Sequence, residues 1–242
     1  MRAVMVSDAH LTGPDDPSQR ALVAWLGALE ADRLYLLGDL FHFWWGFEGA
    51  VMTRYVPVCA ALMSLKRRGV SIHMVPGNHD FATGPFFTEA LGASVDEQVS
   101  VELGGRRYLL AHGDEADRRL GYRLTRRLLR GRGFAGVMRA LGPGRGGELL
   151  ERLAGASREH MGDVAPLVAM QQTWARAQMR ERGAEVVVMG HIHWPEVVAV
   201  DEGIVVHLGA WLGHRTFLVV EDGAAVLRRW RGGDWLGAVV AG

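Results

Sequence analysis

The order of apolar segments along the chain predicts an α/β fold. Short apolar runs that end in Gly, Asp or His alternate with helix-like segments as far as Pro76, and this alternation is typical of a parallel sheet covered by helices. More strand-like runs follow residue 185, and the stretch between the two groups has helical character. With 242 residues, 49% hydrophobic and 22% charged, the composition is that of an ordinary globular protein. We expect one domain over residues 1–242.

Five runs rich in leucine or β-branched residues have the length of buried strands: 3–7, 33–38, 71–76, 106–112 and 185–190. Apolar residues at helical spacing predict helices over 18–31 and 51–68, the second closed by Gly69. The first three strands and these two helices therefore form a β-α-β-α-β unit.

The last part of the chain predicts four more strands, at 197–200, 204–208, 216–220 and 225–230. Turn signals at 201–203 and 221–223 predict an antiparallel meander. The stretch 116–182 shows no strand pattern and is broken by Gly131, Gly133 and the glycine-rich run 142–147. We interpret it as a helical insertion within the domain.

Charge is divided unevenly along the chain. The 27 basic and 27 acidic residues cancel, so net charge does not favour nucleic-acid binding, and no nucleic-acid partner is expected. Residues 118–158, however, hold eleven arginines and two glutamates, a charge of +9, which the remaining 16 basic and 25 acidic residues balance with −9. This basic stretch lies within the predicted insertion.

The single cysteine and the N-terminal sequence limit the cellular setting. Cys59 alone allows neither an intramolecular disulfide nor a thiolate zinc site, and we expect it to be a buried apolar residue on a helix. The N-terminus has no apolar signal region, and no uncharged run approaches the roughly 18 residues that span a bilayer. We expect a cytoplasmic protein that at most binds a membrane face.

Five short polar motifs follow predicted strands: Asp8-Ala9-His10, Gly38-Asp39, Gly77-Asn78-His79-Asp80, His112-Gly113-Asp114 and Gly190-His191-Ile192-His193. Ligands of open α/β sheets bind at the carboxyl ends of the strands, so we expect these motifs to meet in one crevice. Two Asp, one Asn and four His without a thiolate form a mixed oxygen and imidazole set. That set is too large for one tetrahedral ion and suits two ions that share a carboxylate.

In this order the motifs resemble the calcineurin-like metallophosphoesterases, with their pattern D-x-H, G-D, G-N-H-D/E, H and G-H-x-H. The resemblance implies a four-layer α/β/β/α sandwich with a helical lid insertion at about 116–182. It implies two divalent ions, expected to be Mn²⁺ although iron and zinc also suit such ligands. One ion would be held by Asp8, His10, Asp39 and His193. The second would be held by Asp39, Asn78, His112 and His191, with Asp39 shared.

Phosphate-ester hydrolysis gives each residue of this set a role. Two ions about 3.5–4 Å apart bind phosphoryl oxygens and acidify a water for in-line attack. We expect His79 to act as an acid or to stabilise the transition-state charge, with Asp80 setting its tautomer. Asp114 is expected to orient a ligand imidazole. The catalytic set is therefore His79, Asp39 and Asn78.

Other aromatic side chains are weaker candidates. His42 is close enough to Gly38-Asp39 to face the crevice, and Trp44, Trp45 and Trp211 could line an apolar substrate groove or belong to the core. The remaining histidines are expected to be ordinary strand, helix or loop residues: His73, His160, His207 and His214.

Within the superfamily, the chain is similar to the UDP-2,3-diacylglucosamine pyrophosphatases of lipid A biosynthesis. The similarity rests on Gly38-Asp39-Leu40-Phe41, on Gly121-Tyr122 after His112-Gly113-Asp114, on the helical insertion and on Leu208-Gly209-Ala210-Trp211. It implies hydrolysis of UDP-2,3-diacylglucosamine to UMP and 2,3-diacylglucosamine 1-phosphate, with inserted helices as a lid over the acyl chains. The implied substrate contacts are Asn78, His79, Tyr122 and His191.

The insertion has the pattern of amphipathic helices. Leu120, Leu124 and Leu128 recur every four residues with arginines between them, and Phe134 and Met138 lie in a second such stripe. A basic face suits an anionic membrane and an apolar lining suits fatty chains, so we expect peripheral binding to the cytoplasmic face of the inner membrane. The alternative is a cap of helices packed on the core with a solvated arginine face.

The sequence is also compatible with two other functions. One is a calcineurin-like phosphoesterase that acts on a phosphomonoester, a cyclic nucleotide or another dinucleoside substrate. The other is a non-catalytic interaction module that keeps the fold, which the presence of all seven ligand positions argues against.

Overall fold

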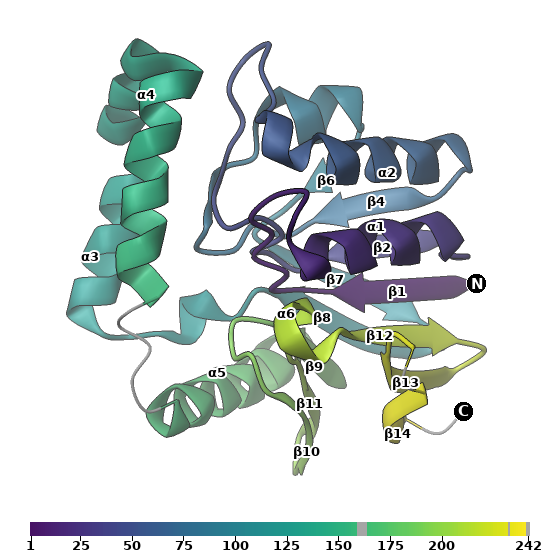
Figure 1. The fold of residues 1–242 in the computed structure, drawn as a ribbon. Coiled ribbons are helices and arrows are strands. Elements are labelled where there is room, and N and C mark those ends of the chain that lie inside the picture. Colours follow the sequence, from purple (N-terminus) through teal and green to yellow (C-terminus); the bar gives the residue numbers. More distant parts are fainter. Residues whose placement is uncertain (159–163, 232, 241–242) are drawn as a thin grey trace.

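Two β-sheets packed face to face form the centre of the protein (Figure 1). The computed structural model describes residues 1–158, 164–231 and 233–240, so His160 lies outside the described residues. The seven-stranded sheet has the order β14-β13-β12-β1-β2-β4-β6. Its strands are β1 (Arg2–Val6), β2 (Arg33–Leu36), β4 (Ser71–Met74), β6 (Ser94–Val95), β12 (Thr216–Glu221), β13 (Ala224–Arg229) and β14 (Gly233–Val240).

The second sheet has five strands in the order β10-β11-β9-β8-β7. They are β7 (Gln98–Leu103), β8 (Arg106–Ala111), β9 (Val186–Met189), β10 (Pro195–Val200) and β11 (Gly203–Leu208). A separate short pair joins β3 (Trp44–Trp45) to β5 (Asp80–Ala82). Short helical turns lie at η1 (Thr53–Tyr55), η2 (Phe86–Ala90), η3 (Asp114–Ala116) and α6 (Trp211–His214).

Helices cover the outer face of each sheet, so the predicted four-layer sandwich is confirmed. On one side α1 (Pro17–Ala28) and α2 (Val56–Arg67) bury Trp25 and Leu62 against Val4 of β1. Apolar side chains of the two inner faces meet between the sheets. On the other side α5 (Ala165–Arg182) buries Ala175 and Met179 against the second sheet.

The predicted strands are present, but their last four do not form one meander. β10 and β11 pair as a hairpin in the five-stranded sheet, and β12 and β13 pair as a hairpin in the seven-stranded sheet. The chain crosses between the two sheets through α6. The hairpin expectations were therefore right and the single meander was wrong, because a turn signal does not say which sheet the next strand joins.

Two helices project from the sandwich and lie beside each other as an arm. α3 (Leu120–Leu129) and α4 (Arg132–Arg158) form this arm, which stands on the side toward which β1, β2 and β4 point (Figure 1). The backbone of α4 is interrupted at Gly142, with φ 69° and ψ −179°, just before Pro143. The predicted break thus occurs at Gly142-Pro143, whereas the glycines that follow are helical. The third helix within the predicted insertion, α5, packs on the second sheet instead.

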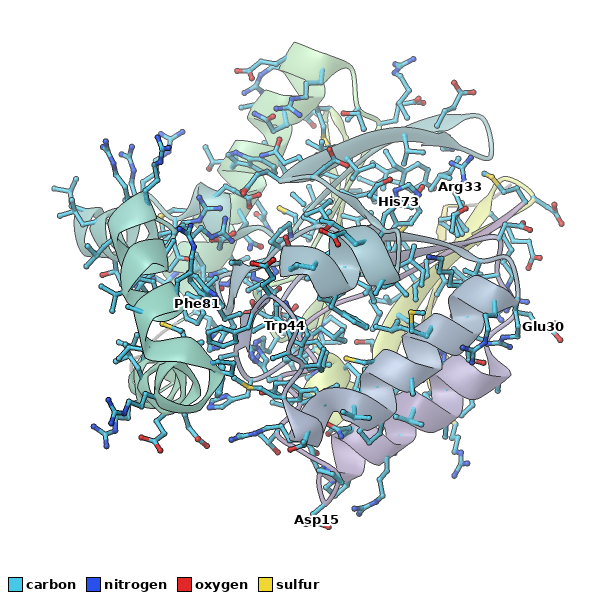
Figure 2. All side chains as sticks on the ribbon, turned by 90° about the horizontal axis from the view of Figure 1, so that it is seen from above. Asp15, Glu30, Arg33, Trp44, His73 and Phe81 are labelled. Carbon is cyan, nitrogen blue, oxygen red and sulfur yellow. The ribbon has the colours of Figure 1, made fainter. Side chains whose placement is uncertain are left out.

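An apolar cluster joins the arm to the sandwich. Phe43, Trp45 and Phe81 of the body pack against Met138 and Leu150 of α4, and Figure 2 shows Phe81 beside this helix. A Cβ at Gly146 would lie 2.9 Å from the ends of the Met138 and Phe47 side chains, which would have to shift to admit it. We call these side chains the arm-base cluster.

Candidate metal centre

The predicted site motifs all follow strands whose carboxyl ends reach the same edge of the sandwich. β1, β2 and β4 run parallel in one sheet, and β8 and β9 run parallel in the other. The loops after these five strands carry Asp8, Asp39, Asn78, His112 and His191. Backbone hydrogen bonds hold the first two loops together, because Asp8 N donates to Gly38 O at 3.0 Å and His10 N donates to Asp39 O at 2.9 Å. The expected convergence is confirmed.

Four residues of these loops have left-handed backbone conformations. Asp8, His10, Asp39 and His191 have φ values of 53°, 44°, 54° and 68°. Residues other than glycine seldom adopt such angles, and positions that keep them are concentrated at functional sites. The fold therefore stores strain to aim these side chains at one point.

Glycines let the loops approach each other closely. A Cβ at Gly77 would lie 2.2 Å from an Asp39 carboxylate oxygen, and a Cβ at Gly190 would lie 2.5 Å from an Asp8 carboxylate oxygen. Either side chain would push a carboxylate out of place. The two glycines of these motifs are thus required by contact with the acidic residues.

Asp8, His10 and His193 form the first group of metal-ligand atoms, all within 4.8 Å of one another. The Nε2 atoms of His10 and His193 are 3.1 Å apart, about the separation expected of two imidazole ligands on one ion. Asp8 Oδ1 is buried, lies 3.6 Å from His193 Nε2 and has no hydrogen-bond partner among the described residues. A cation would satisfy all three atoms, so this group fits a metal.

Asp39, Asn78, His112 and His191 are the second predicted group, and the structure brings ligand atoms of Asp39 and His112 within 4.8 Å of each other and of Asp8. His112 Nδ1 donates to Leu37 O at 2.8 Å, which leaves Nε2 as the lone-pair nitrogen. That Nε2 lies 3.1 Å from Asn78 Oδ1 and 3.6 Å from Asp39 Oδ2, and the His191 ring is 5.2 Å from the His112 ring. Asp39 Oδ2 is also 3.7 Å from His10 Nε2 of the first group. The Asp39 carboxylate is therefore placed between the two groups.

Burial and opposite charges shift the pKa values in this site strongly. Burial acts to lower the pKa of His112, but the carboxylates of Asp39, Asp8 and Asp114 outweigh it and raise that pKa to about 9. For His10 burial dominates and lowers the pKa to about 3. Burial would raise the pKa of Asp39, yet the neighbouring imidazoles, His112 foremost, lower it. The site is thus a buried concentration of negative charge that selects for cations.

His79 is oriented by a backbone carbonyl and not by Asp80. Its Nδ1 donates to His42 O at 2.6 Å, and its backbone N donates to Asp39 Oδ1 at 2.8 Å. Asp80 Oδ2 instead accepts from the backbone N of Asp39 at 2.8 Å and of Gly77 at 3.0 Å. The expected role of Asp80 is therefore corrected. It ties two ligand loops together, and burial followed by the Asp39 charge raises its pKa to about 7.

Asp114 connects the site to the arm. Its Oδ2 accepts from Tyr122 OH at 2.8 Å and from Arg126 Nε at 2.7 Å, and the Tyr122 ring lies 6.2 Å from the His191 ring. Arg130 of the arm donates to Gly77 O at 2.6 Å, next to Asn78. Two arm arginines thus bind the loops that carry predicted ligands, a role that the sequence pattern did not indicate.

Gln171 is a second residue that the sequence did not single out. Its side chain is fully buried in α5, and Nε2 donates to Gly113 O at 3.1 Å and to Gly190 O at 3.4 Å. Gly113 follows His112 and Gly190 precedes His191. One amide therefore spans the two loops that position these histidines.

The weaker aromatic candidates divide between core and site. Trp44 and Trp211 are buried, and their indole N–H groups donate to Thr83 O and Ser18 O. They belong to the core, so the groove alternative is wrong for these two. Trp45 lies in the arm-base cluster. The His42 ring is 6.2 Å from the His79 ring, on the site side as expected.

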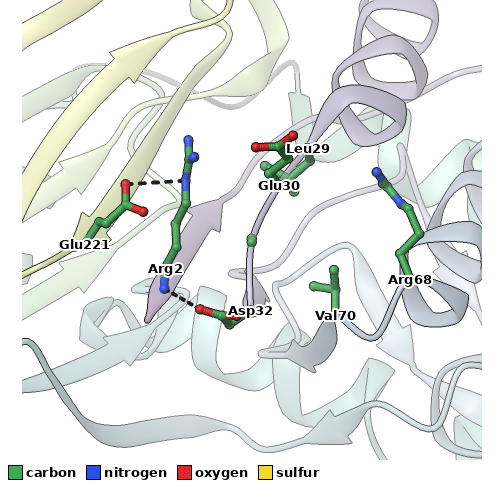
Figure 3. A pocket seen from close by; sticks show the side chains of 8 residues that line it. Arg2, Leu29, Glu30, Asp32, Arg68, Val70 and Glu221 are labelled. Carbon is green, nitrogen blue, oxygen red and sulfur yellow. Dashed lines mark hydrogen bonds and ion pairs between the residues drawn. The ribbon is translucent and has the colours of Figure 1, made fainter.

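A cavity of about 420 Å³ lies at the opposite edge of the seven-stranded sheet (Figure 3). Arg2 and Asp32 line it, and Arg2 N donates to the Asp32 carboxylate at 2.6 Å. Both residues are at the amino ends of their strands. This cavity therefore does not belong to the metal centre.

Comparisons with known proteins identify the family of this chain. The family model for calcineurin-like phosphoesterases matches residues 1–195. A UDP-2,3-diacylglucosamine hydrolase of Porphyromonas gingivalis is 30% identical over 91% of this chain and 94% of its own length. One from Pseudomonas putida is 33% identical over 80% and 82%. Among solved structures, a novel archaeal phosphodiesterase aligns with a TM-score of 0.46 and 14% identity, covering 91% of this chain and 93% of its own. The chain belongs to the calcineurin-like phosphoesterase family.

Proposed function

We propose that the protein hydrolyses a phosphoanhydride at a dinuclear metal centre. Asp8, His10 and His193 would hold one ion, Asn78, His112 and His191 would hold the other, and Asp39 would be shared. Two such ions, when bound, stabilise the charge on phosphoryl oxygens and supply hydroxide at neutral pH. The oxygen and imidazole donors without thiolate are compatible with Mn²⁺, as with iron or zinc, and we propose Mn²⁺ as the resident ion.

The protein's own groups would orient the phosphoryl group and supply a proton. His79 donates its Nδ1 proton to His42 O, so its Nε2 is the atom that faces the reaction. Its ring is 4.8 Å from the His10 ring, beside the first group of ligands. As an imidazolium, with both ring nitrogens protonated, it would give its Nε2 proton to the departing phosphate or stabilise the negative charge there. Asn78 and His191 would contact the phosphoryl oxygens, and Tyr122 would contact the substrate from the arm.

The proposed substrate is UDP-2,3-diacylglucosamine, with UMP and 2,3-diacylglucosamine 1-phosphate as products. The arm-base cluster is the observation that carries this choice. It places Phe81 and Trp45 against Phe134 and Met138 of α4, and Phe81 is only two residues from His79. Apolar side chains at the joint between the arm and the body, close to the site, suit fatty chains. The names of the relatives at 30–33% identity point the same way.

The test is release of UMP from the acylated substrate by purified, Mn²⁺-loaded protein. UDP-glucosamine without acyl chains is the matched control substrate, and the Asp39→Asn variant is the control for metal dependence. We expect turnover of the acylated compound that exceeds that of the control substrate by at least about tenfold, because each buried CH₂ contributes about 0.8 kcal/mol. Equal turnover of both compounds would refute the lipid substrate. No turnover of either compound would refute the proposed hydrolysis of a phosphoanhydride.

We also propose that α3 binds an anionic membrane surface with its apolar face. Leu120, Leu124 and Leu128 are 75%, 68% and 68% exposed, and Arg123 and Arg127 are exposed beside them. Arg126 of the same helix and Arg130, directly after its end, turn inward to Asp114 and Gly77. The leucines of α3 therefore do not pack on the core. Among the described residues no helix is long and apolar enough to span a membrane.

Vesicle sedimentation tests the membrane proposal. The triple variant with Leu120, Leu124 and Leu128 changed to Ser should partition onto phosphatidylglycerol vesicles at least about tenfold less than the wild type, given the apolar area that it removes. Neutral vesicles should bind the wild type more weakly, and salt should reduce binding to the anionic ones. Val56, 48% exposed on α2, gives the matched control Val56→Ser. Unchanged partitioning of the triple variant would contradict the proposal.

A further inference from the structure

Trp194 is an exposed aromatic side chain at the edge that carries the metal centre. Its side chain is 61% exposed, and it directly follows His193. β10 begins at Pro195, which pairs with Leu208 at the carboxyl end of β11. Because β11 runs parallel to β9, this is the edge from which His191 also emerges. The indole therefore lies at the rim of the site.

The surroundings of Trp194 hold it in place. Its ring packs edge-on against the His214 ring, with centroids 5.4 Å apart and planes at 86°. His214 Nδ1 in turn donates to His193 O at 3.0 Å. Gly209 has φ 73°, and a Cβ there would lie 2.8 Å from Pro195, so the strand start is seated closely on the loop after β11. The exposed indole is thus held in one position by the His214 ring and by the close seating of Pro195.

The position of Trp194 assigns the two halves of the substrate to different sides of the site. The arm contacts the loops that carry His112 and Asn78, through Asp114 and Gly77. Trp194 belongs to the loop that carries His193, whose Nε2 faces His10. A phosphoryl group held between the two groups of ligands has its acylated sugar under the arm. The nucleoside then extends over the loop of His193.

We propose that Trp194, supported by His214, is the platform on which the nucleobase of the substrate stacks. This inference rests on the proposed function, since it needs a nucleoside diphosphate derivative at the metal centre. Every base offers a π-face to an indole, so the platform favours a nucleotide over a sugar phosphate without selecting strongly among bases. Removal of one stacking ring typically weakens binding by about tenfold or more.

The experiment measures binding of UMP and of ribose 5-phosphate to Mn²⁺-loaded protein by calorimetry. The two probes share the phosphate and ribose, and only UMP has a base. The wild type should bind UMP about tenfold or more tightly than ribose 5-phosphate. In Trp194→Ala the UMP affinity should fall to that of ribose 5-phosphate, whose own affinity stays within about twofold. Trp194→Phe should retain most of the preference, and Val56→Ala is the matched control for loss of an exposed apolar side chain.

The outcomes separate this inference from the proposed function. An equal loss of affinity for both probes in Trp194→Ala would show that the ring only supports His193, and it would overturn the platform. An unchanged preference for UMP would overturn it too, and if the wild type still releases UMP from the acylated substrate, the proposed function stands. A third outcome is a wild type that releases no UMP from that substrate, together with a Trp194→Ala variant that lacks the preference for UMP that the wild type shows. In that case the platform stands and the proposed substrate is wrong.

Discussion

Replacement of Gln171 by leucine removes one neutral amide without opening a large cavity. The amide donates to Gly113 O at 3.1 Å and to Gly190 O at 3.4 Å, so the change leaves two buried carbonyls that no longer share a donor. Each carbonyl keeps a backbone donor, Ala116 N for Gly113 O and Ile192 N for Gly190 O, so the variant loses only a neutral hydrogen bond, which typically contributes about 0.5–1.5 kcal/mol. Residues that orient metal ligands typically change metal affinity by about 10–100-fold, or roughly 1.4–2.8 kcal/mol, and the lower end of this range meets the contribution of the lost hydrogen bond. We therefore expect Gln171→Leu to loosen the loops of His112 and His191 by this amount.

The effect should appear at one ion and not at both. Titration of the apoprotein with Mn²⁺, followed by electron paramagnetic resonance or calorimetry, should show the step assigned to His112 and His191 weakened about 10–100-fold. The step assigned to Asp8, His10 and His193 should stay within about threefold. Gln178→Leu is the matched control, because the hydrogen bond of Gln178 among the described residues stays within the same helix, to Glu181. Two steps of wild-type affinity in Gln171→Leu, or equal weakening of both, would refute the positioning role.

Three further predictions concern the shared ligand, pH and the arm. Asp39→Asn should weaken the binding of each ion by about 10–100-fold in the same titration, since the amide nitrogen is not a ligand. Retention of two tight metal sites would exclude the shared role of Asp39. His207 is buried and has no hydrogen-bond partner among the described residues, and burial lowers its pKa to about 4. In the unfolded chain this histidine therefore binds a proton near pH 6.5, whereas in the folded chain it does so only near pH 4. The free energy of unfolding should fall by about 3 kcal/mol as the pH drops through this window. Urea titrations at pH 7 and pH 4 should show a decline smaller by that amount in His207→Leu, and equal declines would contradict the assignment. Met138→Ala should remove about 2–5 kcal/mol of packing free energy from the arm-base cluster and so speed tryptic cleavage within α3 and α4. An unchanged cleavage rate would show that the cluster does not hold the arm.

The ligand motifs were predictable because the physics that places them is local. A buried strand followed by a polar turn puts its side chains at the sheet edge, whatever the rest of the chain does. Asp8, Asp39 and His112 therefore came together as expected. β7 shows weaker signals, since only one face of Gln98–Leu103 is buried at all, and the jump from β11 to β12 between sheets leaves no mark in the turn residues.

The orientation of α3 and the role of Gln171 could not be read from the chain. The two faces of α3 differ chemically from each other. Which face turns inward depends on Asp114 and Glu97, two residues of other elements that bind Arg126. Gln171 resembles any helical glutamine until α5 is placed on the second sheet. Long-range contacts decide both cases, and a single sequence does not encode them in a recognisable spacing.

The measurement that tests the central claim most directly is anomalous diffraction from crystals soaked in Mn²⁺. The two groups of ligands share one carboxylate, so two anomalous peaks are expected about 3.5–4 Å apart. Asp39 should lie between them, with Asp8, His10 and His193 around one peak. Asn78, His112 and His191 should surround the other. A single peak, or two peaks that Asp39 does not bridge, would contradict the dinuclear centre.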